Sequence, residues 1–217
     1  MGAMKDLAIS QANEEMYGEG YFERGEGSNY HNYSDDPRWV EILKEMEDKH
    51  NDRELLMLEV GAAKGWFIHH ANLRGHRAEG IDVSKYAVDN CAPLARGFLK
   101  RGDATEGLPF GKNKFDIVCS WEFFEHIDEE ESLEVLHSMI DCLKVGGELW
   151  LRIALSDGAS QETDKDATHI NVKPRAWWER IFTEEARLLE EDTHIKLDKR
   201  FAESDWAGRF FVLKRIS

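Results

Sequence analysis

The sequence predicts an α/β fold: a doubly wound, mostly parallel sheet with helices on both faces, preceded by a short N-terminal cap. From residue 55 onward, short apolar runs alternate with segments of helical period, a pattern typical of parallel strands joined by helical crossovers. A glycine turn follows the first apolar run directly. The 217 residues, 41% of them hydrophobic, are enough for one core.

The order of the elements follows from hydrophobic periodicity along the chain. Pro37 precedes an amphipathic stretch, 39–46, that predicts the first helix. Five strands are predicted after it, at 55–60, 78–83, 98–103, 115–120 and 147–154. Further helices are predicted at 66–73, 85–95, 130–143 and 175–185. Two strand-like runs follow, at 188–197 and 209–214.

Residues 1–38 are assigned to a cap or lid, and residues 39–217 to the main domain. The first three residues, Met-Gly-Ala, are interpreted as a cloning remnant. The cap segment is rich in Glu, Gly, Asn and Asp, yet it carries aromatic residues close together: Tyr21, Phe22, Tyr30 and Tyr33. Flexible tails contain few aromatic residues, so we expect this segment to be partly ordered beside the substrate.

Charge and composition exclude several classes of function. The formal net charge is −15, from 43 acidic and 28 basic side chains, and such a field repels phosphate backbones, so a nucleic-acid partner is not expected. No window has the roughly 18 consecutive apolar residues of a membrane helix, and the first residues lack the layout of a secretory signal. We expect a cytoplasmic protein without a membrane partner. The oligomeric state stays open.

Three cysteines, Cys91, Cys119 and Cys142, stand far apart and form no CxxC pair. Neither a structural zinc site nor a disulfide framework is therefore indicated.

The strongest local signal is the segment Leu58-Glu59-Val60-Gly61-Ala62-Ala63-Lys64-Gly65, which follows a predicted strand and opens a predicted helix. Glycine there lets the backbone turn tightly and approach a ligand closely. Asp82 ends the next strand, 21 positions after Gly61, the spacing at which an acidic side chain can bind the ribose hydroxyls of a nucleotide. The alternative is a glycine turn and a helix-capping Asp in an unrelated α/β protein.

The loop also indicates which nucleotide binds. A dinucleotide site requires G-x-G-x-x-G, so that the backbone clears a pyrophosphate, but here Ala63 occupies the position of the second glycine. The observed form, E-x-G-x-x-x-G, resembles that of the class I S-adenosylmethionine (SAM)-dependent methyltransferases, which have a Rossmann-like fold. SAM has no phosphate, so its loop needs less clearance.

The resemblance extends over residues 55–154, through four more landmarks in order. They are Gly80-Ile81-Asp82-Val83-Ser84, Gly102-Asp103-Ala104, the run 115–127 with Glu125-His126, and Leu143-Lys144-Val145-Gly146-Gly147. The resemblance implies SAM as cofactor, with Asp82 on the ribose and Asp103 on the adenine amino group. The implied cofactor-binding residues are Glu59, Gly61, Ala62, Ala63, Gly65, Asp82, Val83, Asp103, Ala104, Ser120 and Trp121. Ala62-Ala63 departs from the pair commoner in the family, which affects the methionine end of SAM.

Methyl transfer requires alignment of an acceptor lone pair with the methyl group, and often a proton acceptor. His126 is one candidate, although it can also be a structural residue that orients a turn. His169 is the other. Its segment, Asp166-Ala167-Thr168-His169, resembles the D-x-T-H stretch of small-molecule and sugar methyltransferases. Asp166 could hold the tautomer of His169; the alternative is a loop staple. The predicted catalytic residues are thus His169, His126 and Asp166.

The predicted reaction is transfer of the methyl group to a small molecule, at a hydroxyl or carboxyl oxygen, because a His base suits such an acceptor. Nitrogen is second, since the place after the fourth strand reads Ser120-Trp121-Glu122-Phe123 rather than Asn/Asp-Pro-Pro-Tyr/Phe. Alternatives are N-methylation of a small molecule or protein, a non-catalytic SAM-binding protein, and an NAD-dependent oxidoreductase, which Ala63 disfavours. The predicted substrate-binding residues are Tyr21, Tyr30, Glu122 and Trp177. No metal site is predicted, because the spacing of nearby Asp, Glu and His residues matches no known metal pattern.

Overall fold

The computed structural model describes residues 15–157, 164–182, 189–191 and 209–216. Within these residues one sheet has the strand order β3-β2-β1-β4-β5-β7-β6. The predicted α/β fold is confirmed. The strands are β1 (Leu56–Val60), β2 (Arg77–Asp82), β3 (Leu99–Arg101), β4 (Phe115–Trp121), β5 (Leu143–Arg152), β6 (Leu189–Glu191) and β7 (Phe210–Arg215).

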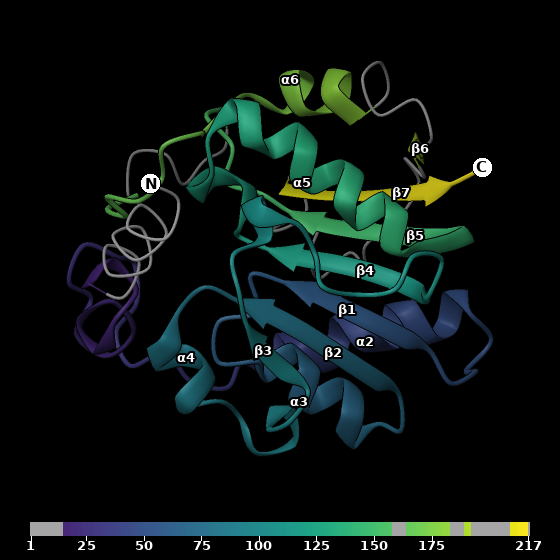
Figure 1. Ribbon diagram of the computed structural model, residues 1–217, viewed down its shortest axis with the longest axis horizontal. Coiled ribbons are helices and arrows are strands. Elements are labelled where there is room, and N and C mark those ends of the chain that lie inside the picture. Colours follow the sequence, from purple (N-terminus) through teal and green to yellow (C-terminus); the bar gives the residue numbers. More distant parts are fainter. Residues whose placement is uncertain (1–14, 158–163, 183–188, 192–208, 217) are drawn as a thin grey trace, which may run out of the picture.

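Strands β1 to β5 are mutually parallel, whereas β7 runs antiparallel to both β5 and β6. In Figure 1 the arrows of the parallel strands point toward the side on which the purple N-terminal segment lies, and the arrow of β7 points the other way. The strand order reverses at β1, which pairs with β2 on one edge and with β4 on the other. In such sheets ligands bind outside the carboxyl ends of the strands at this reversal.

Helices cover both faces of the sheet. The helices are α2 (Arg38–Lys49), α3 (Trp66–Leu73), α4 (Lys85–Asp89), α5 (Glu129–Cys142) and α6 (Arg175–Arg180). Neighbouring strand residues alternate between the two cores: Leu58 packs with α5 and α6, while Met57 packs with α2 and α3. This alternation is the period of two that a strand imposes on its side chains, and it explains why the strands read as continuous apolar runs.

The predicted boundaries differ most from the structure in two places. The helix predicted at 85–95 ends at Asp89, and a separate 3₁₀ turn, Pro93–Ala95, follows because proline cannot continue the helix. Strand β5 begins at Leu143, before the glycine pair. The end of the helix predicted at 175–185 and most of the strand predicted at 188–197 lie outside the described residues, as do residues 1–14. No helix in the described ranges has the length and apolar character needed to span a membrane.

The described part of the cap, from residue 15, is packed against the main domain. It contains a π-helix, Gly20–Arg24, whose Tyr21 and Phe22 are buried. Phe22 contacts Tyr30, Tyr33 and Tyr86 through ring pairs with centroids 5.5–6.2 Å apart. Aromatic contacts of this kind stabilise by burial and by ring geometry. The division of the chain at residue 38 stays a prediction, although α2 begins at Arg38.

A buried carboxylate connects β5 with the end of α2. Glu148 accepts a hydrogen bond from Trp150 Nε1 at 2.9 Å, and its oxygens lie 3.3 Å from His50 Nε2 and 3.4 Å from Lys49 Nζ. Burial alone raises the pKa of Glu148, but the hydrogen bonds from His50 and Trp150 and the charge of Lys49 outweigh it and lower the pKa to about 2.

We therefore expect Glu148→Gln to lower the free energy of unfolding at pH 7 by roughly 1–3 kcal/mol, because charged hydrogen bonds to a buried acceptor are lost. The pKa is depressed in the folded state, so this stabilisation is complete above the unfolded pKa of about 4.3 and is lost as the pH falls toward about 2. Urea unfolding from pH 7 to pH 3 should show the gap to the wild type narrowing below pH 4.5. Glu54→Gln, at an exposed ion pair with Arg77, is the control and should change stability by less than about 0.5 kcal/mol.

Candidate functional site

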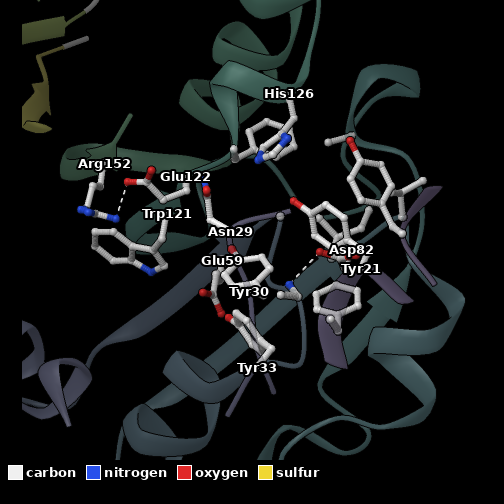
Figure 2. Close-up of a pocket in the computed structure, with 18 of the residues that line it drawn as sticks. Tyr21, Asn29, Tyr30, Tyr33, Glu59, Asp82, Trp121, Glu122, His126 and Arg152 are labelled. Atoms are coloured by element: carbon white, nitrogen blue, oxygen red, sulfur yellow. Dashed lines mark hydrogen bonds and ion pairs between the residues drawn. The ribbon is translucent and has the colours of Figure 1, made fainter. Parts of the chain in front are cut away.

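A cavity of about 770 Å³ lies at the carboxyl ends of β1, β2, β3 and β4, beneath the cap. Figure 2 shows side chains from the sheet and from the cap converging on it: Glu59 and Asp82 from strand ends, Tyr21, Tyr30 and Tyr33 from the cap, and His126 from the turn after β4. This is the position that the strand order predicts for a ligand.

The turn after β1 is built by backbone hydrogen bonds and by two unusual conformations. The amides of Gly61 and Ala62 both donate to the carbonyl oxygen of Ile81 at 3.0 Å. Gly61 has φ +71°, and a Cβ there would lie 2.5 Å from the ring of Phe123, so a side chain has no room. Ala63 has φ +48°, a left-handed conformation that costs a non-glycine residue roughly 1–2 kcal/mol.

Asp82 holds this turn from the end of β2. Its Oδ2 accepts a hydrogen bond from the amide of Ala63 at 2.7 Å, and its Oδ1 accepts one from the amide of Ser84 at 2.8 Å. Burial raises the pKa of Asp82 to about 6, although the two amide hydrogen bonds act in the opposite direction. The carboxylate therefore combines two fixed hydrogen bonds with a face that lines the cavity.

A second buried carboxyl group, Glu59, stands on β1 beside Asp82. It is 3% exposed, and its Oε2 has no hydrogen-bond partner among the described residues. Burial, and then the charge of Asp82, raise the pKa of Glu59 well above its usual range. A buried polar atom without a partner is costly, and both groups are hydrogen-bond acceptors when ionised. This end of the cavity therefore suits a ligand rich in donors or in positive charge.

The structure places eight of the predicted cofactor residues on the cavity wall: Glu59, Gly61, Ala63, Asp82, Val83, Asp103, Ala104 and Trp121. Ala62, Gly65 and Ser120 do not line it. Ala62 and Ser120 are buried in the protein interior. A Cβ at Gly65 would lie 2.8 Å from the Cβ of Ala95, so this glycine permits packing of the helix. For these three residues cofactor binding stays a prediction.

His126 occupies the cavity wall at the end of a short 3₁₀ helix, Phe124–His126, after β4. Its Nδ1 lies 2.7 Å from Thr168 Oγ1, which in turn donates to Asp166 Oδ1 at 2.5 Å. Burial, and then the neighbouring His169, lower the pKa of His126 to about 4. The imidazole is therefore neutral at physiological pH and able to accept a proton.

His169 lies behind His126 and does not line the cavity. The ring centroids are 4.7 Å apart, edge to face. The pairing of His169 with Asp166 that the sequence suggested is corrected: His169 Nδ1 lies 2.5 Å from Asp164 Oδ2, whereas its Nε2 is 3.9 Å from Asp166 Oδ2. The sequence favoured Asp166 because it is nearer to His169 along the chain. Which of the two carboxyl groups meets the ring depends on the fold of the loop, which spacing does not give.

The opposite wall carries Glu122, which has φ +53° and forms ion pairs with Arg152 and, at 3.3 Å, with Arg209. Figure 2 shows Glu122 and Arg152 next to Trp121, across the cavity from Asp82. A non-glycine residue in this conformation is typical of functional sites. Glu122 was predicted to bind the substrate. Two other residues with that prediction, Tyr21 and Tyr30, also line the cavity.

Trp177 is the predicted substrate residue that the structure does not place at the cavity. It lies on α6, packs beside the core under α5, and has Lys173 Nζ 5.3 Å from its ring centroid. Its aromatic character fits packing of this helix. Conversely, the sequence interpretation missed Tyr17, Asn29 and Arg152 on the wall, because single Tyr, Asn and Arg residues in such segments carry no recognisable motif.

Glu125, His126 and His169 each offer a possible metal-ligand atom, all within 4.8 Å of one another. Burial, and then the charge of Glu122, raise the pKa of Glu125 well above its usual range. Its Oε1 also accepts a hydrogen bond from the amide of Ala154 at 3.0 Å. Through this hydrogen bond Glu125 joins the turn after β4 to the residues that follow β5.

Comparisons with known proteins agree with this geometry. Residues 57–147 match a family model described as a methyltransferase domain. Residues 57–147 therefore form part of a methyltransferase domain, and the sheet that holds them has a Rossmann-like fold. A SAM-dependent methyltransferase from Archaeoglobus fulgidus superposes with a TM-score of 0.61 at 15% identity, covering 81% of this chain and 92% of that one.

Two further solved structures share the fold. Geranyl diphosphate C-methyltransferase from Streptomyces coelicolor A3(2), in complex with Mg²⁺, geranyl diphosphate and S-adenosyl-L-homocysteine, has a TM-score of 0.56 at 18% identity, with 82% of this chain and 81% of that one covered. A plantazolicin methyltransferase, in complex with a desmethyl analogue and S-adenosylhomocysteine, has a TM-score of 0.61 at 11% identity, with coverage of 84% and 87%. A search of curated protein sequences finds no match.

SAM is the cofactor of this class of methyltransferase, and the residues present fit it. Its ribose hydroxyls, amino groups and sulfonium are donors or cations, and the cavity offers the carboxyl groups of Asp82 and Glu59, one oxygen of which has no partner among the described residues. The turn at Gly61 leaves no room for a side chain. The cavity thus offers carboxyl oxygens as hydrogen-bond acceptors, and SAM has the hydroxyl and amino groups that can donate to them.

We expect the affinity for SAM to fall as the pH drops below about 6, because hydrogen bonds from the ribose favour the ionised form of Asp82 and the free enzyme takes up a proton there. Asp82→Asn should weaken binding about tenfold or more at pH 8, since a charge-assisted hydrogen bond contributes roughly 1.5–3 kcal/mol. Calorimetry at pH 8 and pH 5 would measure both effects.

Asp89→Asn, in an exposed i,i+4 pair with Lys85, is the matched control and should bind SAM as the wild type does. Equal affinity of Asp82→Asn and the wild type at pH 8, with the same pH dependence, would contradict the assignment of Asp82.

Proposed function

We propose that the enzyme transfers the methyl group of SAM to a small-molecule acceptor, at a hydroxyl or carboxyl oxygen, with His126 as the proton acceptor. The observation that carries the proposal is the position of His126: it lines the same cavity as Asp82 and Glu59, and its Nδ1 is bound to Thr168. A neutral imidazole on the wall of a cofactor cavity is suited to general-base catalysis.

The cavity supports a small acceptor rather than a macromolecule. The cap covers it, and Tyr21, Tyr30 and Asn29 close the side away from the sheet. Two proteins of the same fold have small molecules in their names, geranyl diphosphate and plantazolicin. The polar groups of Glu122, Arg152 and Asn29 could hold an acceptor that carries several hydroxyl or carboxyl groups.

In the proposed reaction, His126 Nε2 takes the proton from the acceptor as its oxygen forms the bond to the methyl carbon. SAM, when bound, would supply an activated methyl group and would keep the electron pair of its C–S bond on sulfur. The His126 imidazolium that results keeps its Nδ1–H on Thr168 and is stabilised by the nearby charges of Asp166 and Glu122. The ring of His169 packs edge to face against that of His126, with centroids 4.7 Å apart.

The test of the function is a search for the acceptor. The enzyme would be incubated with SAM carrying a ¹³C-labelled methyl group and a metabolite extract, and the products examined by mass spectrometry. We expect a small molecule to gain one labelled methyl group on oxygen. Label on nitrogen would overturn the choice of oxygen, and label on protein or nucleic acid would overturn the small-molecule acceptor.

His126→Gln should lower the single-turnover rate by about 10²–10⁴, the usual effect of losing a general base, and should change SAM affinity by no more than a few-fold. His137→Gln, at an exposed position on α5, is the control.

Because the pKa of His126 is lowered to about 4, the neutral form predominates above pH 5. The wild-type rate should therefore not fall between pH 8 and pH 6, as it would with a base of ordinary histidine pKa near 6.5. An unchanged single-turnover rate in His126→Gln would show that His126 is not the general base.

A further inference from the structure

A chain of hydrogen bonds runs from the cap to His126. Tyr21 donates its hydroxyl hydrogen to Asp166 Oδ2 at 2.8 Å. Asp166 Oδ1 accepts from both the amide of Thr168, at 3.0 Å, and its Oγ1, at 2.5 Å. Thr168 Oγ1 then lies 2.7 Å from His126 Nδ1. Tyr21, Asp166 and Thr168 are all buried, so the chain is shielded from water.

The direction of each hydrogen bond follows from the groups involved. A threonine hydroxyl has one hydrogen, and the carboxylate of Asp166 is its strongest acceptor. The oxygen of Thr168 is therefore left to accept from His126, which requires that the hydrogen of the ring is on Nδ1. The lone pair is then on Nε2, the nitrogen needed for proton transfer.

We propose that Thr168 and Asp166 are positioning residues that fix His126 in its Nδ1–H tautomer, and that Tyr21 completes this relay when the cap is in place. The proposal rests on the function of His126 proposed above. It makes the base competent only while the cap covers the cavity, so that proton transfer is coupled to enclosure of the acceptor. Losing the correct tautomer is known to be severe for histidine bases.

Other contacts hold the cap to the same loop. The amide of Ala167 donates to the carbonyl oxygen of Gly27 at 3.0 Å. Asn29 donates to Asp164 Oδ1 at 2.8 Å and accepts from the amide of Lys165 at 3.0 Å. If the cap leaves the loop, these contacts and the hydrogen bond from Tyr21 to Asp166 break together.

His169 does not compete for this relay. Its Nδ1 lies against Asp164, and its ring meets His126 edge to face. Among the described residues, Thr168 is the hydrogen-bond partner found for the His126 ring. One residue therefore decides which nitrogen of His126 carries the hydrogen.

The test compares Thr168→Val, which keeps the shape but removes the hydroxyl, with Thr168→Ser, which keeps it. Ring ¹⁵N chemical shifts of His126 in the full-length protein distinguish the tautomers. We expect the wild type and Thr168→Ser to show Nδ1–H, and Thr168→Val to shift toward Nε2–H. With the acceptor from the labelling experiment, Thr168→Val should lower kcat at least about tenfold while leaving the dissociation constant for SAM within a few-fold.

Tyr21→Phe tests the connection to the cap. It should shift the His126 tautomer in the same direction, by less than Thr168→Val does, and should speed hydrogen exchange of residues 164–171. Tyr86→Phe is the matched control: its hydroxyl donates to Glu23 of the cap at 3.0 Å, away from the relay, and it should leave the tautomer unchanged.

An unchanged Nδ1–H signal in folded Thr168→Val would overturn the relay. A wild-type tautomer in Tyr21→Phe would overturn the role of the cap. A tautomer shift in Thr168→Val with undiminished turnover would support the relay and instead contradict the base assigned to His126, so the two proposals can fail separately. If Thr168→Val does not fold, Thr168→Ala and Thr168→Ser provide the same comparison.

Discussion

Strand β1 pairs with β2 on one side and with β4 on the other, and this central reversal is the constraint on which the site depends. It brings the carboxyl ends of the strands that carry Glu59, Asp82 and Glu122 to one edge of the sheet. Burial raises the pKa of both Glu59 and Asp82, and the charge of Asp82 raises that of Glu59 further; burying such groups opposes folding. The arrangement is tolerable because the sheet is stabilised by apolar cores on both faces, and because a donor-rich ligand relieves the carboxyl groups.

Much of the fold could be predicted from the sequence, because periodicity is a local property. Strands β1, β2 and β4 and helix α3 were found to within a residue, since β-rich apolar stretches and glycine turns mark their ends. The prediction extended α4 too far, as it did not weigh Pro93. The antiparallel pairing of β7 with β5 could not be read from either strand alone, because pairing depends on contacts between distant segments.

The site divides in the same way. The cofactor end was recognisable because its residues belong to short contiguous motifs ending at Gly65 and Asp82. The end of the cavity where we propose proton transfer was only partly recognisable: the sequence pointed to His126 and His169, but not to their hydrogen-bond partners. Thr168 was named only as part of the D-x-T-H stretch, and nothing in the sequence singled out Asp164 as the partner of His169. Trp177 was misplaced because an aromatic residue near a predicted substrate loop is as easily part of a helix core.

The hydrogen bond between Tyr21 and Asp166 joins residues 145 positions apart, and this separation has a consequence for synthesis on the ribosome. The cap is made first, but its partners on the 164–171 loop are made after β5. Contacts between distant residues form late and slow folding. The aromatic residues of the cap must therefore wait in a growing chain, exposed to chaperones and to other nascent chains, until most of the domain has left the exit tunnel.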